Sequence, residues 1–174
     1  MKSDRSPRFS VRRLVLDALF TTIALTIFVI ELNIPLSVGI PGVKLGLANI
    51  ITVVAVFLLS PADAAAILLA RILLAGIFTG QVMALWYSLA GGLLCFAAML
   101  VMRKFVTEKQ IWVSSVIGAV FHNLGQIIVA VAVTRTSAVF YYFPVLMVSG
   151  ILAGLFTGAA AQAVYGRLKK ALKK

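Results

Sequence analysis

The sequence predicts an all-α integral membrane protein with six transmembrane helices in a single bundle. Hydrophobic residues make up 62% of the 174 residues and charged residues only 12%, and the mean hydropathy is +1.09. A soluble domain of this length could not bury so much apolar surface. The apolar residues also fall into blocks of about 17 to 27, the length that a helix needs to cross the hydrocarbon core of a bilayer.

The six predicted helices cover residues 14–33, 44–59, 62–79, 82–102, 111–133 and 139–165. Residues that break helices separate them. Pro35, Pro41 and Gly42 interrupt the first connection, Ser60 and Pro61 form the second, and Gly80 forms the third. Residues 103–110 and 135–137 make the last two connections. Because the second connection is so short, the second and third helices should form a tight hairpin.

The positive charges predict the orientation. Thirteen of the 16 Lys and Arg residues lie before the first helix, in the 103–110 connection or at the end of the chain. By the positive-inside rule these regions are cytoplasmic, which leaves Lys44 and Arg135 outside the cell membrane. We therefore expect one transmembrane domain, residues 14–166, between basic cytoplasmic tails at 1–13 and 167–174. The first apolar block is too long for a signal peptide and lacks a small-residue cleavage site, so we interpret it as a retained span.

The composition excludes several functions. The net charge of +11 is explained by basic flanks that meet anionic lipid headgroups, so we expect the bilayer as a partner and no nucleic acid. Cys95 has no second cysteine, and His122 has no companion at ligand spacing, so neither a disulfide nor a metal site is expected. The chain contains no phosphate-binding GxxxxGK[ST] loop and no aspartate-rich pair for Mg²⁺. We therefore expect a non-catalytic protein without a cofactor.

The junction between the first two helices has the composition of a ligand-binding mouth. It reads Pro-Gly-Val-Lys-Leu-Gly-Leu-Ala-Asn at residues 41–49. Glycines let the backbone approach a bound molecule closely, while Lys44 and Asn49 supply a cation and an amide beside apolar helices. The predicted topology makes this stretch a rim on the outer side.

Arg71 and the fifth helix carry polar groups at mid-depth, where such groups are costly and usually face a partner or a cavity. Arg71 has no acidic residue one turn away, and Asp63 is its nearest acid in the sequence. Either it is a structural arginine, bonded to carbonyl groups or a distant acid, or it is a fixed cation for an anionic ligand. Glu31, at the outer end of the first helix, is either solvated or paired with a cation such as Lys44.

A polar stripe marks the fifth helix. Ser115, Gly118, His122 and Gln126 share one face, with Asn123 beside them. Facing lipid, these groups would remain unpaired at a cost of several kcal/mol, so the stripe should face inward. It either joins helices by hydrogen bonds or lines a ligand cavity.

Small residues recur at four-residue spacing on two helices. Gly150, Gly154 and Gly158 should allow close packing of the sixth helix within the bundle. Ala18, Thr22 and Thr26 make a weaker ridge on the first helix, which could pack internally or dock another membrane subunit.

Three stretches together resemble a known family. They are Ile-Pro at 34–35 with Pro-Gly-Val-Lys-Leu-Gly-Leu-Ala-Asn-Ile-Ile at 41–51, Leu-Ala-Arg-Ile-Leu-Leu-Ala-Gly at 69–76, and Gly-Ala-Val-Phe-His-Asn-Leu-Gly-Gln at 118–126. They are similar to the Gx transporter family, also labelled heptaprenyl diphosphate synthase component I, over residues 11–168. More distantly, the predicted six-helix arrangement resembles the S-components of energy-coupling factor (ECF) transporters, which are six-helix proteins with a ligand pocket on the outer side.

The resemblance implies a substrate-binding subunit that captures a small solute for uptake. The solute would be anionic and either vitamin-like or related to isoprenoids, and the energy would come from an ECF-type transmembrane coupling protein and ATPases. The candidate substrate-binding residues are Lys44, Asn49, Arg71, His122, Asn123 and Gln126, and the candidate docking face is Ala18, Thr22 and Thr26. The alternative is a non-catalytic membrane subunit that supports polyprenyl diphosphate or quinone synthesis, or flavin-based extracellular electron transfer.

Overall fold

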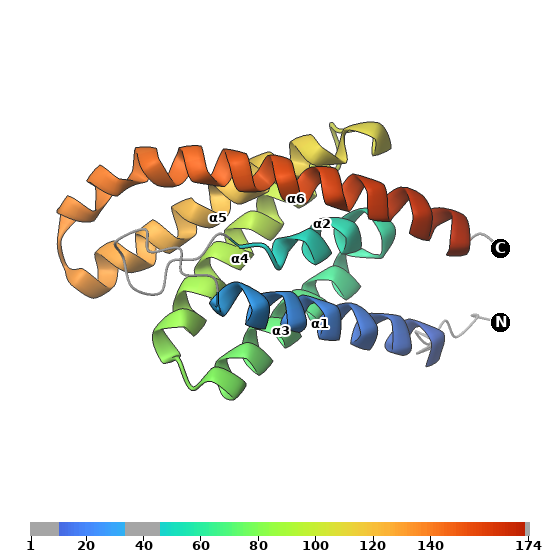
Figure 1. Cartoon of the computed structure of the whole chain (residues 1–174), viewed down its shortest axis with the longest axis horizontal. Coiled ribbons are helices and arrows are strands. Elements are labelled where there is room, and N and C mark those ends of the chain that lie inside the picture. The colour runs from blue at the N-terminus through green and yellow to red at the C-terminus, as the bar shows by residue number, and fades with distance from the viewer. Residues whose placement is uncertain (1–10, 34–45, 173–174) are drawn as a thin grey trace, which may run out of the picture.

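The computed structural model describes residues 11–33 and 46–172, and this part of the chain is helical without strands. The helices are α1 (Val11–Leu32), α2 (Asn49–Leu58), α3 (Pro61–Thr79), α4 (Val82–Met102), α5 (Ile111–Thr134) and α6 (Phe143–Leu172). Two 3₁₀ turns, η1 (Glu108–Gln110) and η2 (Ser137–Tyr142), precede α5 and α6. Figure 1 shows the six helices as one bundle, which confirms the predicted all-helical fold.

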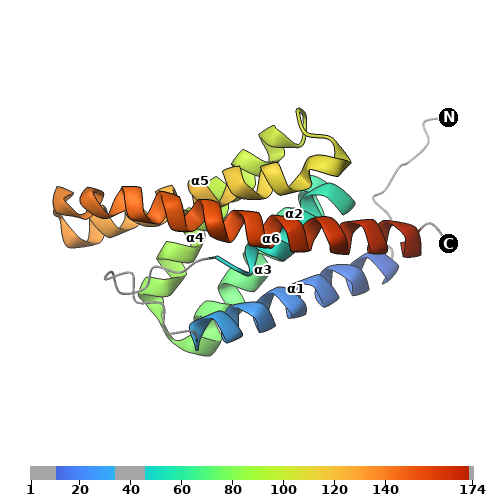
Figure 2. The ribbon, with the colours of Figure 1, turned by 45° about the horizontal axis from the view of Figure 1, so that its top comes forward.

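Successive helices run in alternating directions along the bundle. The start of α1 and the end of α6 lie at the same end of the molecule, and the α4–α5 connection lies toward that end (Figures 1 and 2). The α5–α6 connection lies at the other end. The described parts of the three cation-rich regions, which include Arg12, Lys104 and Lys169, therefore lie toward one end of the bundle, as the predicted topology requires. The cytoplasmic assignment of that end stays a prediction.

Five of the described helices are long and apolar enough to cross a membrane, namely α1, α3, α4, α5 with η1, and α6 with η2. The chain is thus a multi-pass membrane protein. The predicted membrane-length second helix is wrong, because α2 has only 10 residues and measures about 15 Å. The helix cannot extend further toward the N-terminus, since Gly46 has a φ of +75°, outside the helical region.

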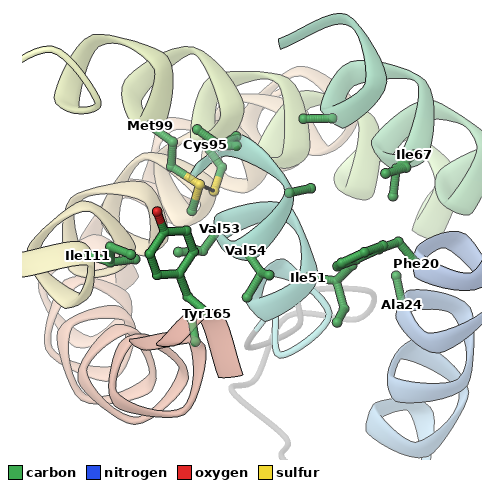
Figure 3. Packing of buried hydrophobic residues seen from close by; sticks show 14 residues of the cluster. Phe20, Ala24, Ile51, Val53, Val54, Ile67, Cys95, Met99, Ile111 and Tyr165 are labelled. Atoms are coloured by element: carbon green, nitrogen blue, oxygen red, sulfur yellow. Dashed lines mark hydrogen bonds between the residues drawn. The ribbon is translucent and has the colours of Figure 1, made fainter. Parts of the chain in front are cut away.

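The short α2 helix is enclosed by its neighbours. All residues from Ile51 to Val56 are buried, and a helix that is apolar all round belongs inside a protein or a bilayer. Figure 3 shows Ile51, Val53 and Val54 within a cluster that also includes Phe20 of α1 and Tyr165 of α6. A helix of this length is typical of a buried core element rather than a complete span.

The ends of the other helices agree with the predicted breaks. Ser60 caps α3 by accepting a hydrogen bond from the Asp63 N–H at 3.2 Å, and Pro61 occupies the first turn. This confirms the predicted break between α2 and α3. The helix α4 has the predicted bounds, whereas α6 begins four residues later than predicted, after η2, and continues to Leu172.

Glycines allow α5 to pack closely against α4 and α6. A Cβ atom at Gly125 would lie 2.6 Å from the Ala90 carbonyl oxygen of α4. A Cβ atom at Gly154 of α6 would lie 2.7 Å from the Val116 Cα, and one at Gly158 would lie 2.8 Å from the Trp112 Cα. The predicted glycine ridge of α6 therefore packs inside the bundle, against α5.

Close packing predicts that Gly154→Ala destabilises the bundle. The new methyl group would meet the α5 backbone, which cannot move without separating the helices, at a cost of about 1–3 kcal/mol. Gly166→Ala is the matched control on the same helix, because a Cβ atom there meets nothing within 4 Å and should add helix propensity. Thermal unfolding in detergent measures both. Equal melting temperatures for Gly154→Ala and Gly166→Ala would contradict the proposed packing.

Candidate functional site

Glu31 of α1 binds the turn that leads into α2. Its Oε1 atom accepts a hydrogen bond from the Gly46 N–H at 2.6 Å, and the backbone N–H groups of Leu47 and Ala48 also interact with this carboxylate. A carboxylate is favoured here because the first N–H groups of a helix have no partner within the helix and carry partial positive charge. Glu31 therefore fixes the start of α2 inside the bundle.

The interpretation of Glu31 as a solvated carboxylate is wrong. The residue is only 6% exposed. Its contact with Lys44, the other alternative, lies outside the described residues. The sequence did not indicate the observed arrangement, because no local pattern shows that an acid near the end of one helix meets the backbone of the next segment.

Arg71 lies in the core of the bundle, on α3, and is 3% exposed. Its charge interacts with Glu31 on α1 and with His122 on α5. Asp63, its nearest acid in the sequence, instead forms a salt bridge with Arg13 at 2.8 Å. Within the described part of the chain, the Arg71 Nη2 atom has no hydrogen-bond partner. Among the described residues, Arg71 is thus a buried cation with a free donor, and its charge interacts with that of the buried Glu31 carboxylate without a direct salt bridge.

The His122 ring lies between two glycines. A Cβ atom at Gly46 would lie 3.0 Å from His122 Cδ2, and one at Gly91 of α4 would lie 2.8 Å from His122 Nδ1. Any side chain at either glycine would displace the imidazole or the adjoining backbone. His122 is 4% exposed, so its ring is fixed between α4 and the turn before α2.

Gln126 and Asn49 complete the group. The Gln126 Nε2 atom lies 3.1 Å from His122 Nε2, and Asn49 Nδ2 would lie 2.8 Å from a Cβ atom at Gly46. Both amides are buried. We call Glu31, Gly46, Asn49, Arg71, His122 and Gln126 the polar cluster.

The polar cluster holds most of the unsatisfied buried polar atoms. The described residues contain six buried side-chain nitrogen or oxygen atoms without a hydrogen-bond partner. Four of them are Asn49 Oδ1, Arg71 Nη2, His122 Nδ1 and Gln126 Oε1. Such atoms are uncommon in folded proteins because each costs about 1–3 kcal/mol. Their concentration in one place is what a binding site without its ligand would show.

The cluster offers binding chemistry. Arg71 supplies a cation and a hydrogen-bond donor, while the free amide oxygens of Asn49 and Gln126 are acceptors. A bound molecule could therefore place an anionic group on Arg71 and donate hydrogen bonds to the amides. The described residues contain no group of three or more His, Cys, Asp or Glu side chains that could hold a metal ion.

The structure brings together four of the predicted site residues, Asn49, Arg71, His122 and Gln126. It places Asn123 at the α5–α6 contact instead, where its Nδ2 atom donates to the Leu146 carbonyl at 2.5 Å. Lys44 lies outside the described residues. On α1, Ala18, Thr22 and Thr26 are exposed, and both threonine hydroxyls donate to carbonyls of their own helix.

Sequence reasoning did not assign Glu31, Gly46 and Gly91 to the site. Gly46 belonged to the glycine-containing motif at 41–49, so its involvement had a signal. Gly91 had none, since its role is to make room for a side chain from α5. Glycines of this kind are recognised only once the facing residue is known.

The Glu31 and Arg71 charges should stabilise each other. Arg71→Met leaves a buried carboxylate without its cation, and Glu31→Gln leaves the cation alone, so each variant should lose on the order of 3 kcal/mol of stability. The double variant should lose clearly less than the sum. Thermal unfolding in detergent tests this.

The matched control is the more exposed pair Arg13→Gln and Asp63→Asn, whose coupling should stay below about 1 kcal/mol. Strictly additive losses at Glu31 and Arg71 would contradict the coupling.

Comparison with known proteins supports one family. The model of the family described as heptaprenyl diphosphate synthase component I matches residues 20–164. No curated protein and no solved structure matches the chain significantly. The family match includes every residue of the polar cluster and covers most of the chain. This protein therefore belongs to the heptaprenyl diphosphate synthase component I family.

Proposed function

We propose that this chain is a non-catalytic, substrate-binding membrane subunit that captures a small anionic solute in the polar cluster. One observation carries the proposal. Within residues 11–33 and 46–172, four buried polar atoms from α2, α3 and α5 have no hydrogen-bond partner, and they belong to one cluster that includes a buried arginine. A ligand that accepts from Arg71 and donates to the two amides would satisfy these groups.

The charge balance favours an anionic group over a cationic one. The Glu31 carboxylate already accepts a hydrogen bond from the Gly46 N–H and interacts with the N–H groups that follow it, so part of its negative charge is offset by the backbone. The Arg71 guanidinium keeps a free Nη2 donor. A planar guanidinium binds carboxylate and phosphate oxygens well. The solute class that fits is a vitamin-like or isoprenoid-related compound with an acidic group.

Uptake would need a separate energy source, because the sequence has no ATP-binding loop. In this proposal the chain works as an S-component does, in the cell membrane with an ECF-type transmembrane coupling protein and ATPases. The small-residue ridge of α1, at Ala18, Thr22 and Thr26, would be the docking face. Its support is that the three residues are exposed and that the hydroxyls of Thr22 and Thr26 are satisfied within the helix, so a partner helix could approach without desolvating a free polar group.

Native mass spectrometry of gently solubilised protein tests solute capture. We expect a small acidic molecule to co-purify with the unaltered chain, together with any coupling or ATPase subunit. Arg71→Met should lose the small molecule, and so should Glu31→Gln combined with Arg71→Met, which removes both charges at once. Arg135→Gln, a change at an exposed cation, should retain it. A small molecule kept by the folded double variant would reject the site.

A second function is favoured by the family description, which names a component of a synthase. In this alternative the chain is an accessory membrane subunit that supports polyprenyl diphosphate or quinone synthesis, or flavin-based extracellular electron transfer. It would bind a catalytic partner or its product rather than import a solute.

Deleting the chain from its host separates the two functions. If the chain is an accessory subunit, prenyl diphosphate synthase activity in isolated membranes should fall on deletion and return when the protein is restored. Expressing the Arg71→Met variant in the deletion strain tests whether the polar cluster is needed for that activity. Unchanged synthase activity after deletion would contradict the synthase alternative and would be compatible with solute capture.

A further inference from the structure

A second candidate binding site lies where α5 begins and α6 ends. A pocket of about 350 Å³ is lined there by Glu108, Lys109, Gln162, Tyr165, Gly166, Lys169 and Lys170. We call it the lysine pocket. It shares no residue with the polar cluster, and it does not depend on the proposed uptake function.

Hydrogen bonds between η1 and α6 fix the shape of the lysine pocket. Gln162 accepts from the Ile111 N–H at 2.9 Å and donates to the Glu108 carbonyl at 2.5 Å. One α6 side chain thus satisfies a backbone N–H at the start of α5 and a backbone carbonyl of η1. Beneath it, Tyr165 is buried. The pocket is a built feature of the α5–α6 contact.

The lysine pocket carries excess positive charge. Lys169 forms a salt bridge with Glu108 and lies 5.6 Å from the centre of the Tyr165 ring. Lys109 and Lys170 are exposed, and neither takes part in a salt bridge found among the described residues. Among the described residues, the lining therefore carries three lysines against one glutamate, around an open hollow at the surface.

Gly166 leaves the lysine pocket open. A Cβ atom at this position would meet nothing within 4 Å, so the α6 backbone itself forms part of the lining. A small side chain would fit the helix better, since glycine costs about 1 kcal/mol relative to alanine in a helix interior. The open space between the lysines leaves room for a phosphate group beside their ammonium groups.

The position of the lysine pocket indicates the source of the phosphate. The 30 residues of α6 span about 45 Å, which exceeds a hydrocarbon core of about 30 Å, so one end of the helix reaches the headgroup region. The pocket lies at the helix end that carries the basic C-terminal residues. Trp112 is exposed on α5, beside Gly158 of α6, and it offers apolar surface for acyl chains.

We propose that the lysine pocket binds the phosphate headgroup of an anionic phospholipid from the leaflet on the basic side of the bundle. Lys109 and Lys170 contact the phosphate, and Lys169 is held in place by Glu108. The bound lipid lies across the α5–α6 seam.

Lipid titration followed by native mass spectrometry tests this proposal. The purified chain is titrated with phosphatidylglycerol, and separately with phosphatidylcholine. We expect retention of phosphatidylglycerol, and about fivefold weaker binding for Lys109→Gln or Lys170→Gln, since each basic residue near anionic lipid contributes about 1 kcal/mol. Gly166→Leu should weaken retention, because its side chain projects into the pocket, while a Cβ atom at this position meets nothing within 4 Å; an unchanged melting temperature checks that the variant is folded. Lys104→Gln is the matched control, an exposed lysine at the same end that does not line the pocket.

Three outcomes would overturn the proposal. Equal retention of the two lipids would show that charge does not select the occupant. An equal loss for Lys104→Gln would assign binding to the general basic surface. Displacement of phosphatidylglycerol by low concentrations of inorganic phosphate, with inorganic phosphate then bound to the protein, would show that the ligand is a free phosphate and not a lipid.

Discussion

The hydrogen bonding of Glu31 to the turn before α2 is the constraint on which the interior of the bundle depends. A helix that begins inside a membrane protein exposes N–H groups that water cannot reach, and each would cost free energy if left unpaired. Glu31 supplies the acceptor, so α2 can start at mid-bundle. Because the turn is fixed there, Gly46 meets the His122 ring and Asn49 faces the same region. One carboxylate thus organises residues from α1, α2 and α5.

This arrangement also makes the buried Arg71 tolerable. A guanidinium in the core of a membrane bundle needs a counter-charge, and the Glu31 carboxylate provides it from the neighbouring α1 helix. Since the carboxylate is shared with backbone N–H groups, it does not use up the donors of the arginine. The result is a cluster with one carboxylate and one guanidinium that, among the described residues, still has free polar atoms. This combination is why we propose a ligand site here.

The sequence predicts the features that rest on local pattern. Apolar block lengths predicted six helices, and the glycine spacing of α6 predicted its close packing, because both follow from helical geometry. Arg71, His122 and Gln126 were found because polar groups are rare at mid-depth. The length of α2 and the role of Glu31 were missed, since they depend on contacts between segments. Asn123 shows the same limit, as adjacent residues on α5 face different helices.

An experimental density map of the protein purified from its native membrane tests the central claim most directly. We predict non-protein density in contact with Arg71 Nη2 and with the free oxygens of Asn49 and Gln126, at a position that Glu31 does not occupy. A map in which these atoms bond only to one another or to scattered waters would contradict the assignment of the polar cluster as a ligand site.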